Sequence, residues 1–230
     1  MAAGEGRRLR PLSERFAKPV LPIDGRPVLA TLLRELEAAG VERAYVVTGH
    51  LGKQVERLVG DGSAFGLDVS FVRQPSPLGS ADAVLRAVRA GAQAPLLVTA
   101  ADTVFTRGDI ARFVDAFAGS GAAGAIAARR DPGPDPPHRW AMRIAEGRVE
   151  RVLDDDPGNP LAGAPLWALG REVVEFLDPL PGNPPHELAD VYSLALEDGR
   201  SIAGVEIGRT RDLTRPVDLA LENFPYLLAL

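Results

Sequence analysis

A glycine- and arginine-rich stretch near the start of the chain has the composition of an anion-binding loop. Residues 2–19 read AAGEGRRLRPLSERFAKP. Small residues let the backbone approach a ligand closely, and consecutive amide groups form a nest that binds anions. Arg8 and Lys18 would then face the phosphate oxygens of that ligand. The alternative is a flexible, arginine-rich segment. The stretch is neither a Walker A motif, which needs Gly-Lys-Ser/Thr, nor a dinucleotide fingerprint, which needs a preceding strand and a third glycine.

A carboxylate follows one of the apolar runs. Asp102 ends the segment PLLVTAAD at residues 95–102. In open α/β sheets, ligands gather at the carboxyl ends of the strands. Magnesium prefers a few carboxylates together with phosphate oxygens, so Asp102 is a candidate Mg²⁺ ligand. Taken alone, the position favours the alternative, an aspartate that caps a helix or a turn.

The segment QPSPLGSADAV at residues 74–84 could read a base. Gln74 carries an amide that can pair with a base edge, and Gly79 permits close approach of a ligand to the backbone. The alternative is a simple helix start in which Ser80 is the N-cap and Asp82 in the first turn favours the helix dipole.

The elements that must position these groups alternate between strands and helices. Short β-rich runs predict strands at residues 43–49, 68–72, 95–102, 124–130 and 201–207. Helical spacing of apolar residues predicts helices at residues 26–40, 80–91, 109–121 and 171–177. Such alternation is typical of an α/β layered fold with a mostly parallel sheet.

The second half of the chain is less regular. Residues 140–144 and 148–153 are predicted to form a hairpin, and residues 130–140 and 154–165 are predicted loops. No linker or internal repeat divides the chain, so we expect one domain.

Composition limits the classes of partner. The 230 residues carry a net charge of −5, which disfavours a nucleic-acid partner bound through bulk charge. The chain has no cysteine, which excludes disulfides, thiolate metal sites and a cysteine nucleophile. No apolar run approaches the ~20 residues that span a bilayer, and no signal-peptide pattern is present. We therefore expect a cytoplasmic protein without a membrane partner. The apolar end at residues 224–230 leaves a homo-oligomer possible.

The motifs resemble those of the sugar-1-phosphate nucleotidyltransferase family, which includes glucose-1-phosphate thymidylyl- and uridylyltransferases and mannose-1-phosphate guanylyltransferases. The resemblance lies in the loop and KPVLPIDGRPVL, in residues 60–84, in LLVTAADTVF and, more weakly, in residues 211–223. It implies a Rossmann-like (GT-A-like) nucleotidyltransferase fold with a mixed, mostly parallel central sheet flanked by helices. It also implies a single domain, residues 1–230, with a nucleotide-binding half (1–120) and an acceptor-binding half (121–230).

The resemblance also implies a role for each site residue. Arg8 would contact the phosphates, Lys18 would hold the α-phosphate or the attacking sugar phosphate, and Asp102 would act with them in catalysis. The metal ligands for Mg²⁺ would be Asp102 and Asp212. The nucleoside triphosphate would be bound by Ala3, Gly4, Glu5, Gly6, Gln74, Gly79 and Ser80. The acceptor, a sugar-1-phosphate or related phosphorylated compound, would be bound by Glu187, Gly163 and Trp140.

The implied reaction is attack by a sugar-1-phosphate oxygen on the α-phosphorus, with release of pyrophosphate. Because the nucleophile is already an anion, no general base is needed, and catalysis reduces to alignment and charge neutralisation.

The sequence departs from the family pattern in several places. Asp156 stands where the family has a lysine on the sugar phosphate, and Arg211 and Arg215 are new cations that could replace it. The family's opening strand is not seen before residue 2, so we expect it to be encoded upstream of Met1. Two alternatives stay open: a cytidylyltransferase acting on a non-sugar alcohol phosphate, suggested by LTRPVDL, and a catalytically weak nucleotide-binding regulatory homologue.

Overall fold

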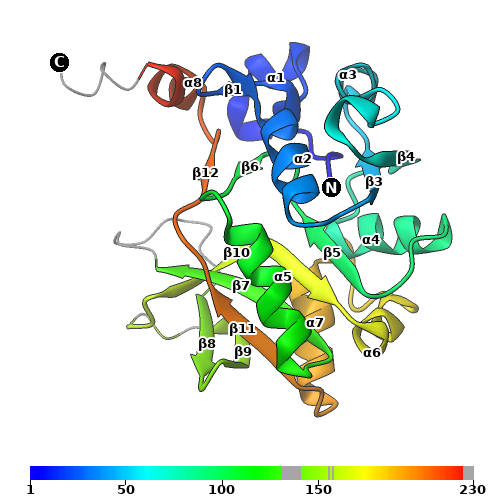
Figure 1. Ribbon diagram of the computed structural model, residues 1–230, viewed down its shortest axis with the longest axis vertical. Coiled ribbons are helices and arrows are strands. Elements are labelled where there is room, and N and C mark those ends of the chain that lie inside the picture. The colour runs from blue at the N-terminus through cyan, green and yellow to red at the C-terminus, as the bar shows by residue number, and fades with distance from the viewer. Residues whose placement is uncertain (131–140, 155, 157, 225–230) are drawn as a thin grey trace. The chain divides into compact units, whose positions relative to one another are not determined.

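The structure is a computed structural model that describes residues 1–130, 141–154, 156 and 158–224. Its internal contacts divide the chain into two compact units, each assembled from separate segments (Figure 1). Unit 1 consists of Met1–Pro77, Ala100–Arg107 and Thr210–Leu230, and unit 2 of Leu78–Thr99 and Gly108–Arg209. Each unit therefore depends on contacts between residues far apart in the sequence.

Unit 1 contains three small two-stranded sheets among short helices. Its helical elements are η1 (Arg7–Leu9), α1 (Leu12–Arg15), η2 (Lys18–Val20), α2 (Val28–Ala38), α3 (Gly52–Val59), η3 (Ser63–Phe65) and α8 (Pro216–Asn223). Its strands are β1 (Pro22–Ile23), β2 (Arg26–Pro27), β3 (Arg43–Thr48), β4 (Asp68–Arg73), β6 (Thr103–Val104) and β12 (Arg211–Asp212). β3 and β4 pair in parallel, whereas β1–β2 and β6–β12 are antiparallel.

The core of unit 1 joins both ends of the described chain. The helix α2 buries apolar residues at helical spacing, among them Val28, Leu32 and Leu36. Val28 also belongs to a buried cluster that contains Leu9 of η1 and Leu213, which follows β12. This cluster fixes the glycine-rich loop and the segment after β12 to the same core.

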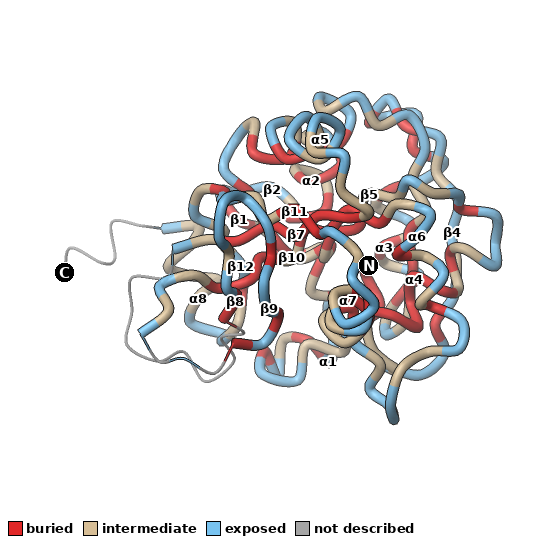
Figure 2. Tube along the Cα trace, turned by 90° about the horizontal axis from the view of Figure 1, so that it is seen from below, coloured by how far each residue is buried: buried red, intermediate tan, exposed pale blue. Residues whose placement is uncertain are grey.

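Unit 2 is a three-layered arrangement of helices around one sheet. Its helical elements are α4 (Ser80–Arg89), α5 (Asp109–Ser120), α6 (Arg171–Val174), η4 (Glu175–Leu177) and α7 (Leu188–Glu197). Its strands are β5 (Leu96–Thr99), β7 (Gly124–Arg130), β8 (Ala141–Ala145), β9 (Arg148–Asp154), β10 (Leu161–Leu169) and β11 (Ile202–Glu206), in the sheet order β5-β10-β7-β11-β9-β8. In the view of Figure 1, α5 lies in front of this sheet and α7 behind it. Both helices shield the sheet from solvent, and its central strands are the most buried part of the unit (Figure 2).

The α/β class is confirmed, but the prediction of a mostly parallel sheet is wrong for the six-stranded sheet. Of the strand pairs in its described residues, only β7–β11 is parallel. The reason is topological: β8 and β9 form a hairpin, and β10 runs antiparallel to both of its neighbours, β5 and β7. The sheet is therefore mixed.

The loop predicted at residues 154–165 is wrong at its end, because β10 begins at Leu161. Gly163 and Pro165 made this segment look irregular, and the register shift between Gly163 and Trp167 accommodates both residues within a strand. The division into halves at residue 120 stays a prediction. Among the described residues, no helix combines the length and apolar character that crossing a membrane requires.

Candidate active site

A cavity of about 360 Å³ lies in unit 1 beside the glycine-rich loop. It is lined by Met1, Ala2, Gly4, Gly6, Arg7, Arg8, Leu9, Lys18, Pro19, Ala100, Asp102, Leu213 and Thr214. Five of the residues predicted from the sequence are among them: Gly4, Gly6, Arg8, Lys18 and Asp102. The structure therefore brings the predicted phosphate-binding and catalytic residues to one surface.

The glycine-rich loop turns at Gly6, which has a φ of 60° and leads into η1. A side chain at this position would be strained by the backbone angle, and its Cβ would lie 3.3 Å from Cβ of Ser13. Arg8 of η1 is exposed and, within the described part of the chain, makes no hydrogen bond or ion pair. The guanidinium of Arg8 is thus available for an anionic ligand in the cavity.

Lys18, which lines the cavity, lies near two aspartates: Asp102, which also lines it, and Asp212, which does not. Nζ of Lys18 lies 2.5 Å from Oδ2 of Asp102 and 3.8 Å from Oδ2 of Asp212. The antiparallel pair β6–β12 places Asp212 opposite Thr103, the residue after Asp102, so the backbone brings the two carboxylates together. The hydroxyl of Thr214 donates to Oδ1 of Asp212 at 3.0 Å and helps to orient it.

The two carboxylates fit magnesium only in part. Oxygens of Asp102 and Asp212 lie near one ammonium group, so both carboxylates face the same cation. No group of three or more His, Cys, Asp or Glu side chains in the described residues could hold a metal ion alone. Magnesium takes oxygen ligands and often completes its shell with substrate phosphates, so the donor set fits this ion when a nucleotide supplies the remaining oxygens.

Two residues of the loop predicted to bind nucleotide do not line the cavity. Glu5 pairs with Arg7, with Oε2 2.7 Å from Nε, and the hydrogen bond from Arg7 lowers the pKa of Glu5. Ala3 is buried and packs against Gly49, where an added Cβ would lie 2.7 Å from O of Ala3. Sequence reasoning missed Arg7 and Thr214, which do line the cavity. The adjacency of Arg7 to Arg8 and the spacing of Thr214 from Asp212 were the available signals.

Unit 2 holds a second group of predicted residues at the facing ends of two helices. The hydroxyl of Ser80 donates to Oε2 of Glu187 at 2.5 Å and accepts a hydrogen bond from N of Leu188 at 2.8 Å. The same Oε2 accepts from N of Ser80 at 3.2 Å. Each helix thus has its first amide satisfied by a side chain from the other segment. Ser80 is not the N-cap of α4, as the alternative had it, because Gly79 occupies that position.

Gly79 is fixed against the chain that leads into α7. Its φ is 102°, and an added Cβ would lie 2.1 Å from O of His186. N of His186 donates to O of Leu78 at 2.8 Å, and N of Ala81 donates to O of His186 at 2.9 Å. The close approach that this glycine allows is, in the described structure, an approach of backbone to backbone.

The remaining predicted residues lie elsewhere. Gln74 is buried just after β4 in unit 1, where its backbone N donates to O of Thr48, and it is not among the cavity-lining residues. Gly163 is buried within β10, opposite Ala128 of β7. Trp140 lies outside the described residues. The prediction that these three contact base or acceptor stays a prediction.

An arginine pairs with the acidic segment that stands where the resemblance implies a lysine. Arg143 lies 3.3 Å from Oδ1 of Asp154 and 3.6 Å from Oδ2 of Asp156. A hydrogen bond from Asn159 and, next, the contact with Arg143 lower the pKa of Asp154. Asp156 therefore has a cationic partner within its own unit, which weakens the repulsion expected between this carboxylate and a phosphate.

The two new arginines near Asp212 are also engaged. Arg211 pairs with Asp24 and, at 3.1 Å, with Glu222 of α8, while Arg215 lies 3.4 Å from Asp218. Replacement of the missing lysine by either guanidinium would require these pairs to break.

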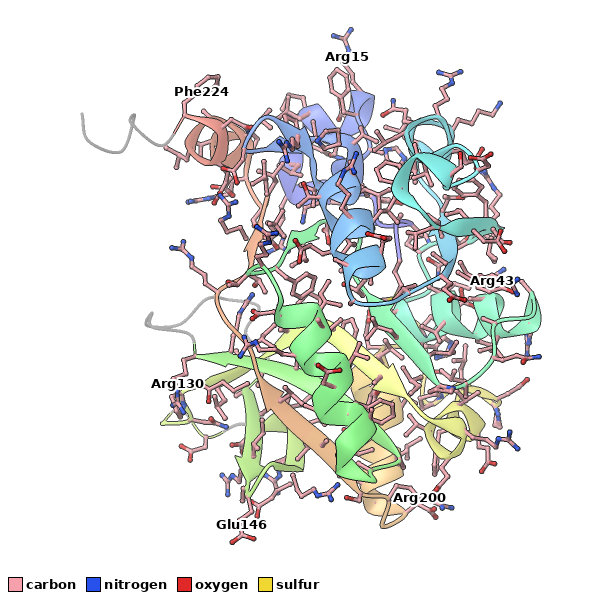
Figure 3. All side chains as sticks on the ribbon, in the orientation of Figure 1. Arg15, Arg43, Arg130, Glu146, Arg200 and Phe224 are labelled. Carbon is pink, nitrogen blue, oxygen red and sulfur yellow. The ribbon has the colours of Figure 1, made fainter. Side chains whose placement is uncertain are left out.

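Arginines at the surface of each unit contrast with Lys18. Arg43, Arg130 and Arg200 point outward from their elements (Figure 3). Their side chains are 66%, 63% and 37% exposed and pair with Asp68, Glu206 and Glu172. The side chain of Lys18 is 12% exposed, so its ion pairs are shielded from water far more than theirs. Such shielding strengthens an electrostatic interaction.

Comparison with known proteins finds similarity to nucleotidyl transferases. The profile described as nucleotidyl transferase matches residues 1–147. A low-salt glycan biosynthesis nucleotidyltransferase of Haloferax volcanii is 27% identical over 97% of this chain and 64% of its own length. A mannose-1-phosphate guanylyltransferase of Mycobacterium tuberculosis is 29% identical over 95% of this chain and 61% of its own. The chain thus spans under two thirds of the length of both. The structure of a UDP-glucose pyrophosphorylase from Acinetobacter baumanii superposes with a TM-score of 0.82, at 20% identity, over 99% of this chain and 92% of that one.

Proposed function

The chain belongs to the nucleotidyl transferase family, and we propose that it transfers a nucleotidyl group from a nucleoside triphosphate to a sugar-1-phosphate. The observation that carries this proposal is the convergence of Lys18, Asp102 and Asp212 at a cavity bordered by the glycine-rich loop. The arrangement suits a reaction between two polyanions, because it combines cations, carboxylates and the backbone of a glycine-rich loop. The relative from M. tuberculosis is named for the same class of acceptor.

The reaction forms a bond between a phosphate oxygen of the acceptor and the α-phosphorus, and it breaks the bond between the α-phosphorus and the bridging oxygen to the β-phosphate. Pyrophosphate leaves with the bonding electrons. The attacking oxygen carries a negative charge already, so no residue needs to remove a proton. The protein must align two anions and reduce their repulsion.

The residues of the cavity divide that task. Amides of the loop around Gly4 and Gly6 would cradle the terminal phosphates, since consecutive amides bind anions. Arg8, which has no other partner in the described chain, would pair with a phosphate. Lys18 would neutralise charge at the α-phosphate or at the attacking phosphate. Asp102 and Asp212 would hold Mg²⁺, which supplies charge neutralisation and fixes phosphate oxygens when bound.

A non-sugar acceptor is the second candidate, and the pairing of Asp154 and Asp156 with Arg143 favours it. Where the family resemblance implies a lysine on the sugar phosphate, this chain has a carboxylate that already has a partner. Cytidylyl transfer to an alcohol phosphate would not depend on the sugar contacts that have changed. The third possibility, a nucleotide-binding protein with little activity, keeps the cavity but not the transfer.

The test is release of pyrophosphate with Mg²⁺ present, for four nucleoside triphosphates crossed with a panel of sugar-1-phosphates and alcohol phosphates. Release with one sugar-1-phosphate supports the proposal and names both substrates. Release with an alcohol phosphate alone supports the second candidate. Absence of release, together with thermal stabilisation by a triphosphate, would contradict both in favour of the nucleotide-binding protein. We also propose a cytoplasmic location, where such triphosphates are available; a homo-oligomer remains a prediction.

A further inference from the structure

The ammonium of Lys18 lies beside the two carboxylates that would hold a metal ion. Nζ lies 2.5 Å from Oδ2 of Asp102 and 3.8 Å from Oδ2 of Asp212. The side chain of Lys18 is 12% exposed, against 29% for Asp102 and 49% for Asp212. The lysine is thus the innermost of the three groups, and the carboxylates converge on it.

A divalent cation held by these carboxylates would compete with this ammonium. Nζ already lies 2.5 Å from Oδ2 of Asp102, and magnesium binds carboxylate oxygens at about 2.0–2.1 Å, so an ion on that oxygen would lie within about 5 Å of Nζ. The two cations would repel each other in a site partly shielded from water. Binding of the metal therefore favours movement of the ammonium away from Asp102.

The side chain of Lys18 can move into the adjoining cavity. Lys18 lines the same cavity as Arg8 and Gly6, where the proposed function puts the triphosphate. Lysine carries a compact charge on a flexible four-carbon stem, whereas an arginine fork holds a carboxylate through two fixed hydrogen bonds. Only two of the 26 Lys and Arg residues in this chain are lysines, Lys18 and Lys53. At a position where the side chain must exchange one anionic partner for another, lysine is therefore more suitable than arginine.

We propose that Lys18 is a resident counter-ion for Asp102 and Asp212, and that it moves onto a phosphate when a metal–nucleotide complex binds. The inference rests on the proposed function, because it takes the cavity as the triphosphate site. Before binding, Lys18 holds the two carboxylates together and suppresses their affinity for free metal. After binding, the same charge serves the phosphates. Metal alone is then bound weakly, and metal and triphosphate favour each other's binding.

The proposal predicts that removing the positive charge of Lys18 increases the affinity of the protein for a metal ion. The experiment measures the dissociation constant of Mn²⁺, without nucleotide, by electron paramagnetic resonance of the free ion. Lys18→Met should bind Mn²⁺ at least about tenfold more tightly than the wild type, which lies within the usual range of coupling between sites. Arg8→Met is the matched control, since it removes a positive charge from the same cavity but from neither aspartate. Its affinity should change by less than about threefold, the part due to general electrostatics.

A second variant, Lys18→Gln, guards against misfolding of the first, and both are checked by circular dichroism. If folded Lys18 variants bind Mn²⁺ no more tightly than Arg8→Met, the displacement is overturned. The proposed function is judged separately, by Mn²⁺ binding with a non-hydrolysable triphosphate present. If the wild type binds the metal under that condition and Asp102→Asn does not, the metal site stands even where the displacement fails. If neither binds it, both proposals are overturned.

Discussion

In unit 1 Lys18 and Asp102, which face the cavity, are held by an ion pair, whereas in unit 2 Ser80, Glu187 and Gly79 are held by helix-end hydrogen bonds and by steric exclusion. Lys18 lies near two carboxylates; a bound anion could replace them as partners of the ammonium, and a bound cation could replace the ammonium as their partner. Ser80 and Glu187 satisfy amides at the starts of two helices, and Gly79 has no room for a side chain. Ion pairs on flexible side chains exchange readily, but caps and backbone contacts do not. The contacts of Lys18 in unit 1 are therefore of the kind that can exchange, and those of Ser80, Glu187 and Gly79 in unit 2 are of the kind that fix geometry.

The largest expected effect is on catalysis in unit 1. Asp102→Asn keeps the shape of the side chain but removes its charge, so pyrophosphate release should fall about 10³-fold, comparable with loss of one strong transition-state contact. Asp68→Asn is the control, because Asp68 pairs with Arg43 at an exposed site in the same unit and does not line the cavity. Turnover of the control should match the wild type. Equal turnover in Asp102→Asn would remove Asp102 from the metal site.

The next effect concerns rigidity in unit 2. Gly79→Ala combines a strained backbone with a Cβ placed 2.1 Å from O of His186, and it should lower the free energy of unfolding by about 2–4 kcal/mol. Gly108→Ala is the control for a positive φ alone, since Gly108 also precedes a helix but has open space around its Cβ and a left-handed ψ of −5°, against 173° for Gly79. Urea denaturation should show only about 1 kcal/mol for the control. Equal losses would mean that the contact with His186 is not tight.

A smaller effect tests the link between the two helix starts. Ser80→Ala removes the acceptor for N of Leu188 and a donor to Glu187, so the free energy of unfolding should fall by about 1–2 kcal/mol. Ser193→Ala is the matched control on α7, because its hydroxyl donates only within that helix, to O of Ala189. The control should lose less than about 0.5 kcal/mol. In a Glu187→Ala background the effect of Ser80→Ala should shrink, and strict additivity would contradict the pairing.

The two units also differ in how far the sequence predicts them. Helical spacing correctly predicted α2, α4 and α5, and β-rich runs predicted β3, β4, β7 and β11, because each pattern is local. The strand β10 was missed, since Gly163 and Pro165 suit a loop and only pairing with β5 and β7 makes the segment a strand. The helices α3 and α7 were also not predicted; α3 is short.

The site follows the same rule. Lys18, Asp102 and Asp212 were identified by resemblance, and the structure brings them together through the β6–β12 pair. The partners of the charges could not be predicted. Glu187 reaches Ser80 from 107 residues away, and Arg211 reaches Asp24 across 187 residues. No local pattern encodes such pairs. A pattern gives the bounds of a helix or strand, whereas these pairs depend on which helices and strands pack together.

The smallest expected effect is a pH dependence at the ion pair between Arg211 and Asp24. The hydrogen bond from Arg211 lowers the pKa of Asp24, so this pair contributes stability above the ordinary aspartate pKa of about 3.9 and loses it as pH falls through the lowered value. Asp24 is largely exposed, so Arg211→Gln should cost under about 1 kcal/mol at pH 6, and less at pH 3. Urea denaturation at both pH values measures the difference. Asp24→Asn preserves the left-handed backbone at this position, where φ is 52°, and supplies the matched background. In that background Arg211→Gln should lose most of its pH dependence. A pH dependence that persists there would assign it to the other partner, Glu222.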